Sequence, residues 1–426
     1  MEGWKTDKFK NQIENKSGYT WAKEQESPVP EPNSVRVLTV TNIQDKLDLT
    51  SELYLRGVKD KDKREKMVSK NWSIAVSSNG NRKRIGNAVF IQDDTDYMFA
   101  SFLTGFRPKT NSELLPDYFY RWLSSYIVQE RISSVSEGTT GLGNLDLRYL
   151  RNMDIVYPNK AEQTAIANIL SKVDEAIASV QSSIIAAERL KKSLMQNLLT
   201  GKMKPDGTFR TPEEFYIDEK FGKVPVGWEV KRVKDFGEVI TGKTPPTDEP
   251  EVFSDKERGY MFITPGDLDS AKHIEKTERY VSDKGIKYSY VLPKNSVCEV
   301  CIGSTIGKIG ITTEECCTNQ QLTSVIVNED NDVNYFYYAM SLRREHFKSV
   351  AGINATPQIN KSGYSKYRIL CPKDKKEQVS IALKICSIDD NIVVQEQKVR
   401  VLERLKKSLM QNLMTGQVRI QKIHTL

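Results

Sequence analysis

The chain has 426 residues, enough for two or three domains with cores of their own. Hydrophobic residues make up 38% and charged residues 28%, and no apolar run is long enough to span a membrane. The formal net charge is +7, from 63 Lys+Arg against 56 Asp+Glu, which is too small a bias to establish a nucleic-acid partner by itself.

Two features predict a cytoplasmic protein. The charged N-terminal segment lacks the apolar stretch of a secretory signal. All cysteines lie in the second half of the chain, so we expect reduced thiols and no disulfide framework. The cysteines are Cys298, Cys301, Cys316, Cys317, Cys371 and Cys386.

The first region, residues 1–157, mixes strand-like runs with a helical stretch. Strands are predicted at 34–41, 73–77 and 88–92, and a helix at 117–133. Basic and Gly/Thr-rich loops of this region are candidates for phosphates or guanine edges, although a solvated hairpin turn explains the first loop equally well. The candidates are Arg82, Lys83, Arg84, Arg107, Lys109, Thr139 and Thr140.

Residues 158–201 predict one long helix, which follows Pro158 and ends at a glycine cap, Gly201. Its apolar residues alternate in steps of three and four, which is typical of a coiled-coil seam. The seam residues are Ile166, Leu170, Val173, Ile177, Val180, Ile184, Leu194 and Leu198. About 38 residues at ~1.5 Å each make a rod on the order of 55–60 Å.

Residues 202–224 form a polar connector with little periodicity. Asp206 and Asp218 faintly resemble a nuclease carboxylate pair. We expect no strands here to hold them together, so a nuclease site is not supported.

The second region, residues 225–371, is again mixed. Strands are predicted at 260–264, 296–302, 308–312 and 322–327, and a helix at 333–348. Lysine, hydroxyl and amide side chains in its loops are of the kind that contact phosphates or read adenine. These candidates are Lys243, Thr244, Ser304, Thr305, Lys308, Gln320, Gln321 and Asn354.

Two apparent catalytic or metal motifs of this region fail on their context. Residues 237–244 satisfy the phosphate-loop pattern, but Pro245-Pro246 prevents the helix whose N–H groups would bind phosphate. Cys298 and Cys301 alternate within a predicted strand, which favours buried thiols over a zinc site. With only three histidines, no catalytic residue and no metal ligand is predicted.

Residues 372–419 predict a second long helix that repeats the first. Glu403–Gly416 matches Glu188–Gly201 except for Met414 in place of Leu199. Its seam residues are Ile381, Ile385, Ile388, Ile392, Val399, Leu402, Leu409 and Leu413. In both helices a lysine, Lys191 or Lys406, falls on the seam, and we expect the neighbouring Leu190 or Leu405 to replace it there.

The connectivity makes the two helices antiparallel partners, because the second must return toward the start of the first. The alternative is that each packs into an ordinary bundle. The predicted fold class is α+β: two globular mixed domains joined by two long antiparallel coiled-coil helices, with a pseudo-twofold internal repeat.

Taken together, the chain resembles the specificity subunit of type I restriction–modification systems over essentially its whole length. The similarity is strongest in the second half, in Pro225–Glu229, Thr241–Pro245, Gly266–Leu268, Gly303–Ile311 and Asn319-Gln320, and in the repeated helix. The first region matches only loosely, up to Thr104–Pro108.

The resemblance implies that each globular region is a target recognition domain reading one part of a split, asymmetric double-stranded DNA site in the major groove. It also implies that the helices set the spacer and dock two methyltransferase subunits, which restriction and translocation subunits then join. S-adenosylmethionine, ATP and Mg²⁺ would belong to those partners, and this chain would be no enzyme. The rival interpretations are a dimerising adaptor for proteins, and the recognition half of a methyltransferase–nuclease.

Overall fold

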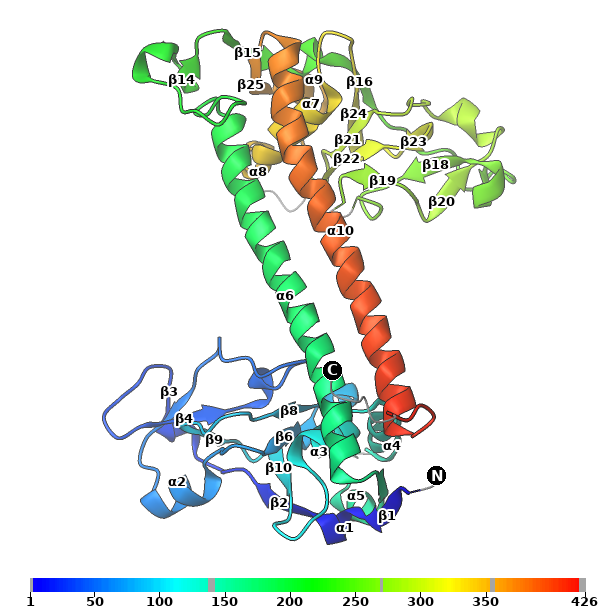
Figure 1. Ribbon diagram of the computed structural model, residues 1–426. Coiled ribbons are helices and arrows are strands. Elements are labelled where there is room, and N and C mark those ends of the chain that lie inside the picture. Colours follow the sequence, from blue (N-terminus) through cyan, green and yellow to red (C-terminus); the bar gives the residue numbers. More distant parts are fainter. Residues whose placement is uncertain (1–2, 137–141, 269–270, 353–356, 421–426) are drawn as a thin grey trace. The chain divides into compact units, whose positions relative to one another are not determined.

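The computed structural model describes residues 3–136, 142–268, 271–352 and 357–420 (Figure 1). The chain divides into two compact units: unit 1 is Met1–Gln181 with Gln397–Leu426, and unit 2 is Ser182–Glu396. Each long helix therefore contributes one part to each unit. The predicted boundaries, with domains at 1–157 and 225–371, helices at 158–201 and 372–419 and a connector at 202–224, stay a prediction.

Unit 1 consists of short strands interleaved with helices. Its strands are β1 (Lys5–Lys8), β2 (Ile13–Ser17), β3 (Glu26–Ser27), β4 (Val35–Leu38), β5 (Tyr54–Leu55), β6 (Ser73–Val76), β7 (Ser78–Asn79), β8 (Ala88–Phe90), β9 (Tyr97–Phe99), β10 (Leu103–Pro108), β11 (Gly143–Asn144) and β12 (Asp154–Tyr157). Its helices are α1 (Phe9–Gln12), α2 (Asp60–Lys66), α3 (Pro116–Leu123), α4 (Tyr126–Val135), α5 (Leu147–Asn152) and the first part of α6 (Lys160–Leu198).

Unit 2 has a similar succession of elements. Its strands are β13 (Phe215–Asp218), β14 (Gly222–Pro225), β15 (Trp228–Arg232), β16 (Gly237–Thr241), β17 (Phe253–Ser254), β18 (Tyr260–Ile263), β19 (His273–Ile274), β20 (Arg279–Val281), β21 (Val297–Val300), β22 (Ile309–Thr312), β23 (Cys316–Thr318), β24 (Leu322–Val327) and β25 (Arg368–Pro372). Its helices are α7 (Val333–Leu342), α8 (Arg344–Ala351), α9 (Lys361–Lys366) and the first part of α10 (Lys375–Met414).

The two units share one sheet topology, although their sequences differ. The main sheet has the order β2-β10-β6-β8 in unit 1 and β16-β24-β21-β22 in unit 2, where β19 adds a fifth strand. A second sheet has the order β3-β5-β4-β9 in unit 1 and β17-β20-β18-β23 in unit 2. In each second sheet only the last pair is parallel. The repeat therefore extends beyond the helices to the whole unit.

The predicted strands are confirmed in position; β24 has the predicted bounds, and the others are slightly shorter than expected. Both predicted globular helices break in two, into α3 and α4 and into α7 and α8. In unit 1 the break falls at Ser124 and Ser125, where the Ser125 hydroxyl bonds the carbonyl of Trp122 at 2.7 Å. The expectation that the connector holds no strands was wrong, because β13 and most of β14 lie in it and form an antiparallel hairpin. The carboxylate of Asp218 accepts the N–H groups of its turn.

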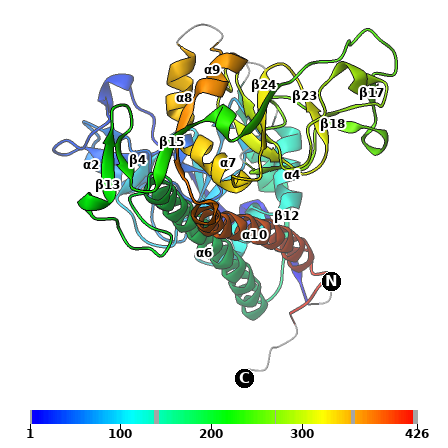
Figure 2. The same cartoon turned by 90° about the horizontal axis from the view of Figure 1, so that it is seen from above.

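The two long helices pair antiparallel within each unit, as the seam predicted (Figures 1 and 2). The structure gives α6 39 residues and α10 40 residues. Seven seam residues are buried and the other nine are half-buried, so the seam faces inward. The buried seam residues are Ile166, Leu170, Val180, Leu198, Ile381, Ile385 and Leu413.

The expectation for the seam lysines was wrong. Leu190 and Leu405 are exposed, at 52% and 46%. The lysines themselves stay in the seam because each meets an aspartate of the other helix: Lys406 pairs with Asp174 at 2.6 Å, and Lys191 pairs with Asp389. Sequence periodicity could not place these aspartates opposite the lysines, because the register of the pair was unknown.

Equivalent glutamines fasten the start of each long helix to its unit. Gln163 accepts the N–H of Leu115 at 2.8 Å and donates to Pro158. Gln378 accepts the N–H of Asp332 at 2.9 Å and donates to Pro372 in the same way. Both glutamines are fully buried, so their hydrogen bonds replace water in the core.

In each unit, an arginine that follows one long helix bonds a glutamate at the start of the other long helix. The same arginine lies near a tryptophan ring. In unit 1, Arg419 forms two hydrogen bonds to Glu162 and lies 5.6 Å from the Trp4 ring. In unit 2, Arg210 bonds Glu377 and lies 5.5 Å from the ring of Trp228. Trp4 and Trp228, each preceded by a glycine near the start of its half, therefore pack at the ends of the long helices.

Candidate nucleic-acid interface

Three loops of unit 2 meet at one end of its main sheet. They follow β16, follow β21 and join β23 to β24. Backbone hydrogen bonds join them, from Gly242 N to Leu322 O at 3.0 Å, from Lys243 N to Thr318 O at 2.9 Å, and from Cys301 N to Gln321 O at 2.8 Å. A Cβ at Gly242 would collide with backbone oxygens, so this close approach requires glycine.

The same three loops meet in unit 1 through equivalent bonds. Gly18 N donates to Leu103 O at 3.3 Å, Tyr19 N to Phe99 O at 2.7 Å, and Ser77 N to Phe102 O at 2.8 Å. A Cβ at Gly18 would again collide with a backbone carbonyl. The two units thus place three loops on one scaffold, and the side chains on the loops differ.

A fourth segment joins each cluster. Leu145 N donates to Ser77 O in unit 1 and Ile359 N to Cys301 O in unit 2, both at 2.8 Å. The Gly/Thr-rich loops that precede these residues carry three predicted DNA contacts. Thr139, Thr140 and Asn354 lie outside the described residues.

In unit 2 the structure brings most of the predicted contacts together. Lys243 and Gln320 are exposed. Thr244, which follows Lys243 in the chain, donates a hydrogen bond from its hydroxyl to the amide oxygen of Gln320. In the adjoining loop, Ser304 is exposed, and Thr305 and Lys308 are half-buried.

Gln321 is oriented differently from the other predicted contacts. Its amide accepts from Asn319 at 3.0 Å and reaches Ile302 O at 3.5 Å. It therefore holds the loops together more than it offers groups to a ligand.

No helix follows Lys243-Thr244, so the phosphate-loop pattern is a coincidence of sequence. The loop continues in extended form to Pro245 and Pro246. Its lysine and threonine remain available for a polyanion other than a bound nucleotide.

In unit 1 the basic loop divides into two roles. Arg82 and Lys83 are exposed on a 3-10 turn, Arg82–Arg84, which Asn81 caps. The guanidinium of Arg84 instead points inward and donates to the carbonyls of Val40 at 2.9 Å and Ile43 at 2.6 Å. Arg84 therefore joins the loop to the second sheet, and the exposed cations are its two neighbours.

Arg107 and Lys109 are not brought together with that loop, because they lie at the other end of β10. Arg107 pairs with Glu14 and lies 4.7 Å from the Trp72 ring, while Lys109 donates to Lys10 O at 2.7 Å. Lys16 lies over the same ring, and burial, together with Arg107 and Lys66, lowers its pKa to about 8. This is a separate cationic cluster.

Sequence reasoning missed two residues of the unit 1 loops. Tyr19 occupies the place of Lys243, and Phe102 lies in the turn that corresponds to the Gln320-Gln321 turn. The available signal was Gly18, which matches Gly242 in the folded chain. The surrounding residues differ too much for an alignment of the two halves to reveal it.

Four buried thiols and one buried acid, Glu299, lie in the strands of unit 2 or at their ends. Cys298, Cys301, Cys316 and Cys317 are buried, and burial raises the pKa of the Cys317 thiol to about 11. Within the described part of the chain no cluster of His, Cys, Asp or Glu is arranged to hold a metal ion. Nor does any described helix have the length and hydropathy to cross a bilayer.

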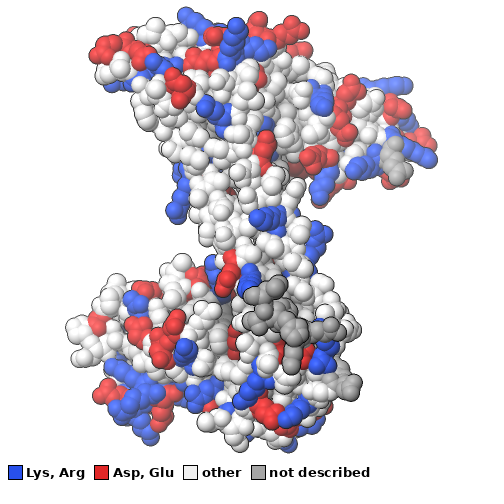
Figure 3. All heavy atoms as spheres, in the orientation of Figure 1, with Lys and Arg blue, Asp and Glu red and all other residues white. Residues whose placement is uncertain are grey.

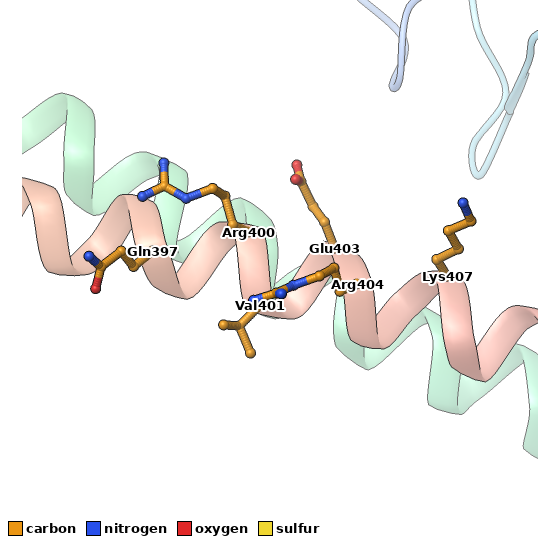
Figure 4. Close-up of a pocket in the computed structure, with 6 residues that line it drawn as sticks. All are labelled: Gln397, Arg400, Val401, Glu403, Arg404 and Lys407. Atoms are coloured by element: carbon orange, nitrogen blue, oxygen red, sulfur yellow. The ribbon is translucent and has the colours of Figure 1, made fainter. Parts of the chain in front are cut away.

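Charge is mixed over the surface drawn in Figure 3. Blue side chains gather over α2, but Lys61 pairs with Glu65 and Lys63 with Asp60 there, as on a solvated helix. A second basic surface is shallow and lies on α10 in unit 1 (Figure 4). It is lined by Gln397, Arg400, Val401, Glu403, Arg404 and Lys407.

Comparison with known proteins agrees with this architecture. The family model for the type I restriction modification DNA specificity domain matches residues 1–189 and 225–404. The MjaX specificity subunit of Methanocaldococcus jannaschii is 22% identical, over 99% of this chain and 95% of its own. The HindI type I restriction enzyme specificity subunit of Haemophilus influenzae is 23% identical, over 85% and 90%.

Two solved structures have the same fold. One is the S subunit of a type I restriction–modification system from M. genitalium, with a TM-score of 0.60, 16% identity and 96% coverage of both chains. The other comes from a study of assembly and conformational transition of the type I R-M system, with a TM-score of 0.55, 13% identity and coverage of 98% and 99%.

Proposed function

Because this chain belongs to the family of type I restriction–modification DNA specificity proteins, we propose that each unit reads one part of a split, asymmetric DNA sequence. The reading surface of each unit is its cluster of three loops. The long helices hold the two readers and set the number of unread base pairs between the half-sites. The chain itself supplies recognition and performs no chemistry.

One observation carries this proposal: the loops of the two units share backbone bonds but differ in exposed side chains. Unit 1 presents Arg82, Lys83 and Phe102, and unit 2 presents Lys243 and Gln320. A guanidinium binds guanine, an amide binds adenine, and an apolar ring contacts thymine methyl groups. One scaffold with two sets of side chains suits a reader of two different half-sites.

Two methyltransferase subunits are the proposed protein partners. The seam is occupied within the helix pair, so docking would use the outward surface of the helices. The repeat supplies this surface twice, with exposed Leu405 beside Arg404 in unit 1 and exposed Leu190 beside Arg189 in unit 2. Arginine is enriched at protein interfaces, and the same pair of exposed residues is offered in each unit.

The partner subunits would bring the chemistry. S-adenosylmethionine would serve adenine methylation, and ATP and Mg²⁺ would serve restriction and translocation subunits that join the complex. None of these would be bound by this chain, which would act on double-stranded DNA in the cytoplasm.

Genome-wide mapping of methylated adenine, with and without this gene, tests the proposal. We expect one bipartite motif to disappear when the gene is deleted. Gel shift of duplexes with the chain and its methyltransferase partner should then depend on that motif. A protein adaptor would leave the methylation map unchanged and would show no sequence-dependent shift.

A further inference from the structure

Phe102 lies in the turn that connects β9 to β10, in the middle of the unit 1 loop cluster. The turn is rigid, because Leu103 N donates to Ala100 O and Ser101 N to Tyr19 O, both at 2.9 Å. The carbonyl of Phe102 accepts two further bonds, from Ser77 N at 2.8 Å and Ser78 N at 3.2 Å. The backbone of Phe102 is therefore fixed to the loop that carries Arg82 and Lys83.

The side chain of Phe102 does not share in this packing. It is 53% exposed, whereas its neighbours Phe99 and Leu103 are buried completely. The exposed part of the ring adds no burial to the fold, and its contact with water is unfavourable in free energy. An exposed ring on a rigid turn, hydrogen-bonded through its backbone to the loop that carries two exposed cations, suits contact with a ligand that has both anionic and apolar groups.

Duplex DNA has both properties in its major groove. Phosphates flank the groove, and thymine is the one unmodified base that places a methyl group in it. The equivalent turn of unit 2 carries the exposed Gln320, whose amide matches adenine, and Gln321, whose amide is held by Asn319. On the same backbone, the turn of unit 1 therefore offers an apolar contact to a base, and the turn of unit 2 offers a polar contact.

We infer that Phe102 is a specificity-determining residue, whose ring packs against a thymine C5-methyl group in the half-site read by unit 1. The inference rests on the proposed function, to which it adds the chemistry of one base contact. Arg82 and Lys83 would hold the adjoining phosphates, so the ring meets the base edge from a fixed position.

The test removes the methyl group from the DNA and the ring from the protein separately. The full chain, with its methyltransferase subunits, is titrated with duplexes of the mapped site in which each thymine is replaced singly by deoxyuridine. One position should lower the affinity of the unchanged protein roughly fourfold, the value expected for one lost methyl contact. The Phe102→Ser variant should bind the thymine and deoxyuridine duplexes equally at that position.

Phe209→Ser is the matched control, because Phe209 is 65% exposed and lies in the connector of unit 2. It should keep every dependence on thymine methyl groups. The inference is wrong if Phe102→Ser retains the same dependences, if it weakens all duplexes equally, or if it impairs only methyltransferase binding without DNA. If the unchanged protein shows no sequence preference, the proposed function itself is wrong. A sequence preference that does not depend on Phe102 would contradict the inference alone.

Discussion

Lys191 of α6 forms an ion pair with Asp389 of α10, and the repeat-equivalent residues Lys406 and Asp174 form the same pair in unit 1 with the helices exchanged. Each helix therefore supplies one lysine and one aspartate. Both ion pairs form together when the two helices are antiparallel and in this one register. Charges inside a helix seam add specificity of register more than stability.

Reversing one charge should expose this role. In Asp389→Lys, two ammonium groups meet in a half-buried site, and we expect the free energy of unfolding to fall by about 2–4 kcal/mol. Adding Lys191→Asp should restore most of the loss, because the hydroxyl of Tyr338, which bonds Asp389, can also accept from a lysine. Urea unfolding of the single and double variants measures the coupling.

The neighbouring exposed residues give the control for this experiment. Asp390→Lys, with or without Lys192→Asp, should change stability by less than about 0.5 kcal/mol, because both side chains lie in solvent. Equal losses at Asp389 and Asp390 would show that the seam pair has no part in pairing the helices.

Glu299 should make unit 2 less stable as the pH rises. It is fully buried, the Tyr364 hydroxyl bonds it at 3.1 Å, and burial raises its pKa to about 8 from an ordinary value of 4.5. The folded state therefore keeps its proton to a higher pH than the unfolded state. Its contribution to stability is complete below pH 4.5 and is lost as the pH rises toward 8.

Glu299→Gln keeps the shape of the side chain and removes the titration. We expect the variant to lose most of the decline in stability between pH 5 and pH 8, and to exceed the unchanged protein above pH 8 by on the order of a few kcal/mol. Thermal unfolding across this range is the measurement. An identical pH profile for both proteins would show that Glu299 ionises normally.

The basic loop of unit 1 should separate into binding and structural residues. Arg82→Ala with Lys83→Ala should weaken DNA binding and reduce the salt slope by roughly two, because each phosphate contact contributes about 0.9. Arg84→Ala should instead lower the unfolding temperature, since it removes a donor from the carbonyl of Val40 and from that of Ile43. Fluorescence titrations at several salt concentrations, with thermal scans, distinguish the roles. If Arg84→Ala reduced the salt slope and the double variant lowered the unfolding temperature, the binding and structural roles would be exchanged.

Replacing a buried glutamine should loosen the base of a long helix. Gln378→Leu leaves Asp332 N without its side-chain acceptor and removes a donor from Pro372 O, which costs about 1–3 kcal/mol. Gln163→Leu should cost a similar amount in unit 1, and Gln411→Leu, on an exposed position of α10, should cost little. Hydrogen exchange at the start of α10 would detect the local effect, and unchanged protection would contradict it.

The sequence predicted the features that depend on local pattern. The heptad steps identified both helices and their seam, and the repeat of Glu188–Gly201, with one substitution, identified the internal symmetry. The same pattern misplaced Leu190 and Leu405, because the partners of Lys191 and Lys406 are set by register, which a single helix does not encode.

The loop cluster depended on contacts between distant segments. Arg82 was selected for its charge, but no local feature distinguished it from Arg84, whose acceptors Val40 and Ile43 lie far away in the chain. Phe102 was missed because a phenylalanine usually belongs to the core. Only its tertiary exposure marks it as part of the interface.

Adenine-methylation mapping of helix insertion variants tests the central claim most directly. Four residues, about one turn, inserted near Val180 of α6 and at the equivalent Gln395 of α10 would lengthen the pair by ~6 Å, or roughly two base pairs at ~3.4 Å each. We predict a methylated motif with both half-sites unchanged and a longer spacer between them. An unchanged spacer in an active variant would contradict the claim that the helices set the distance between the two readers.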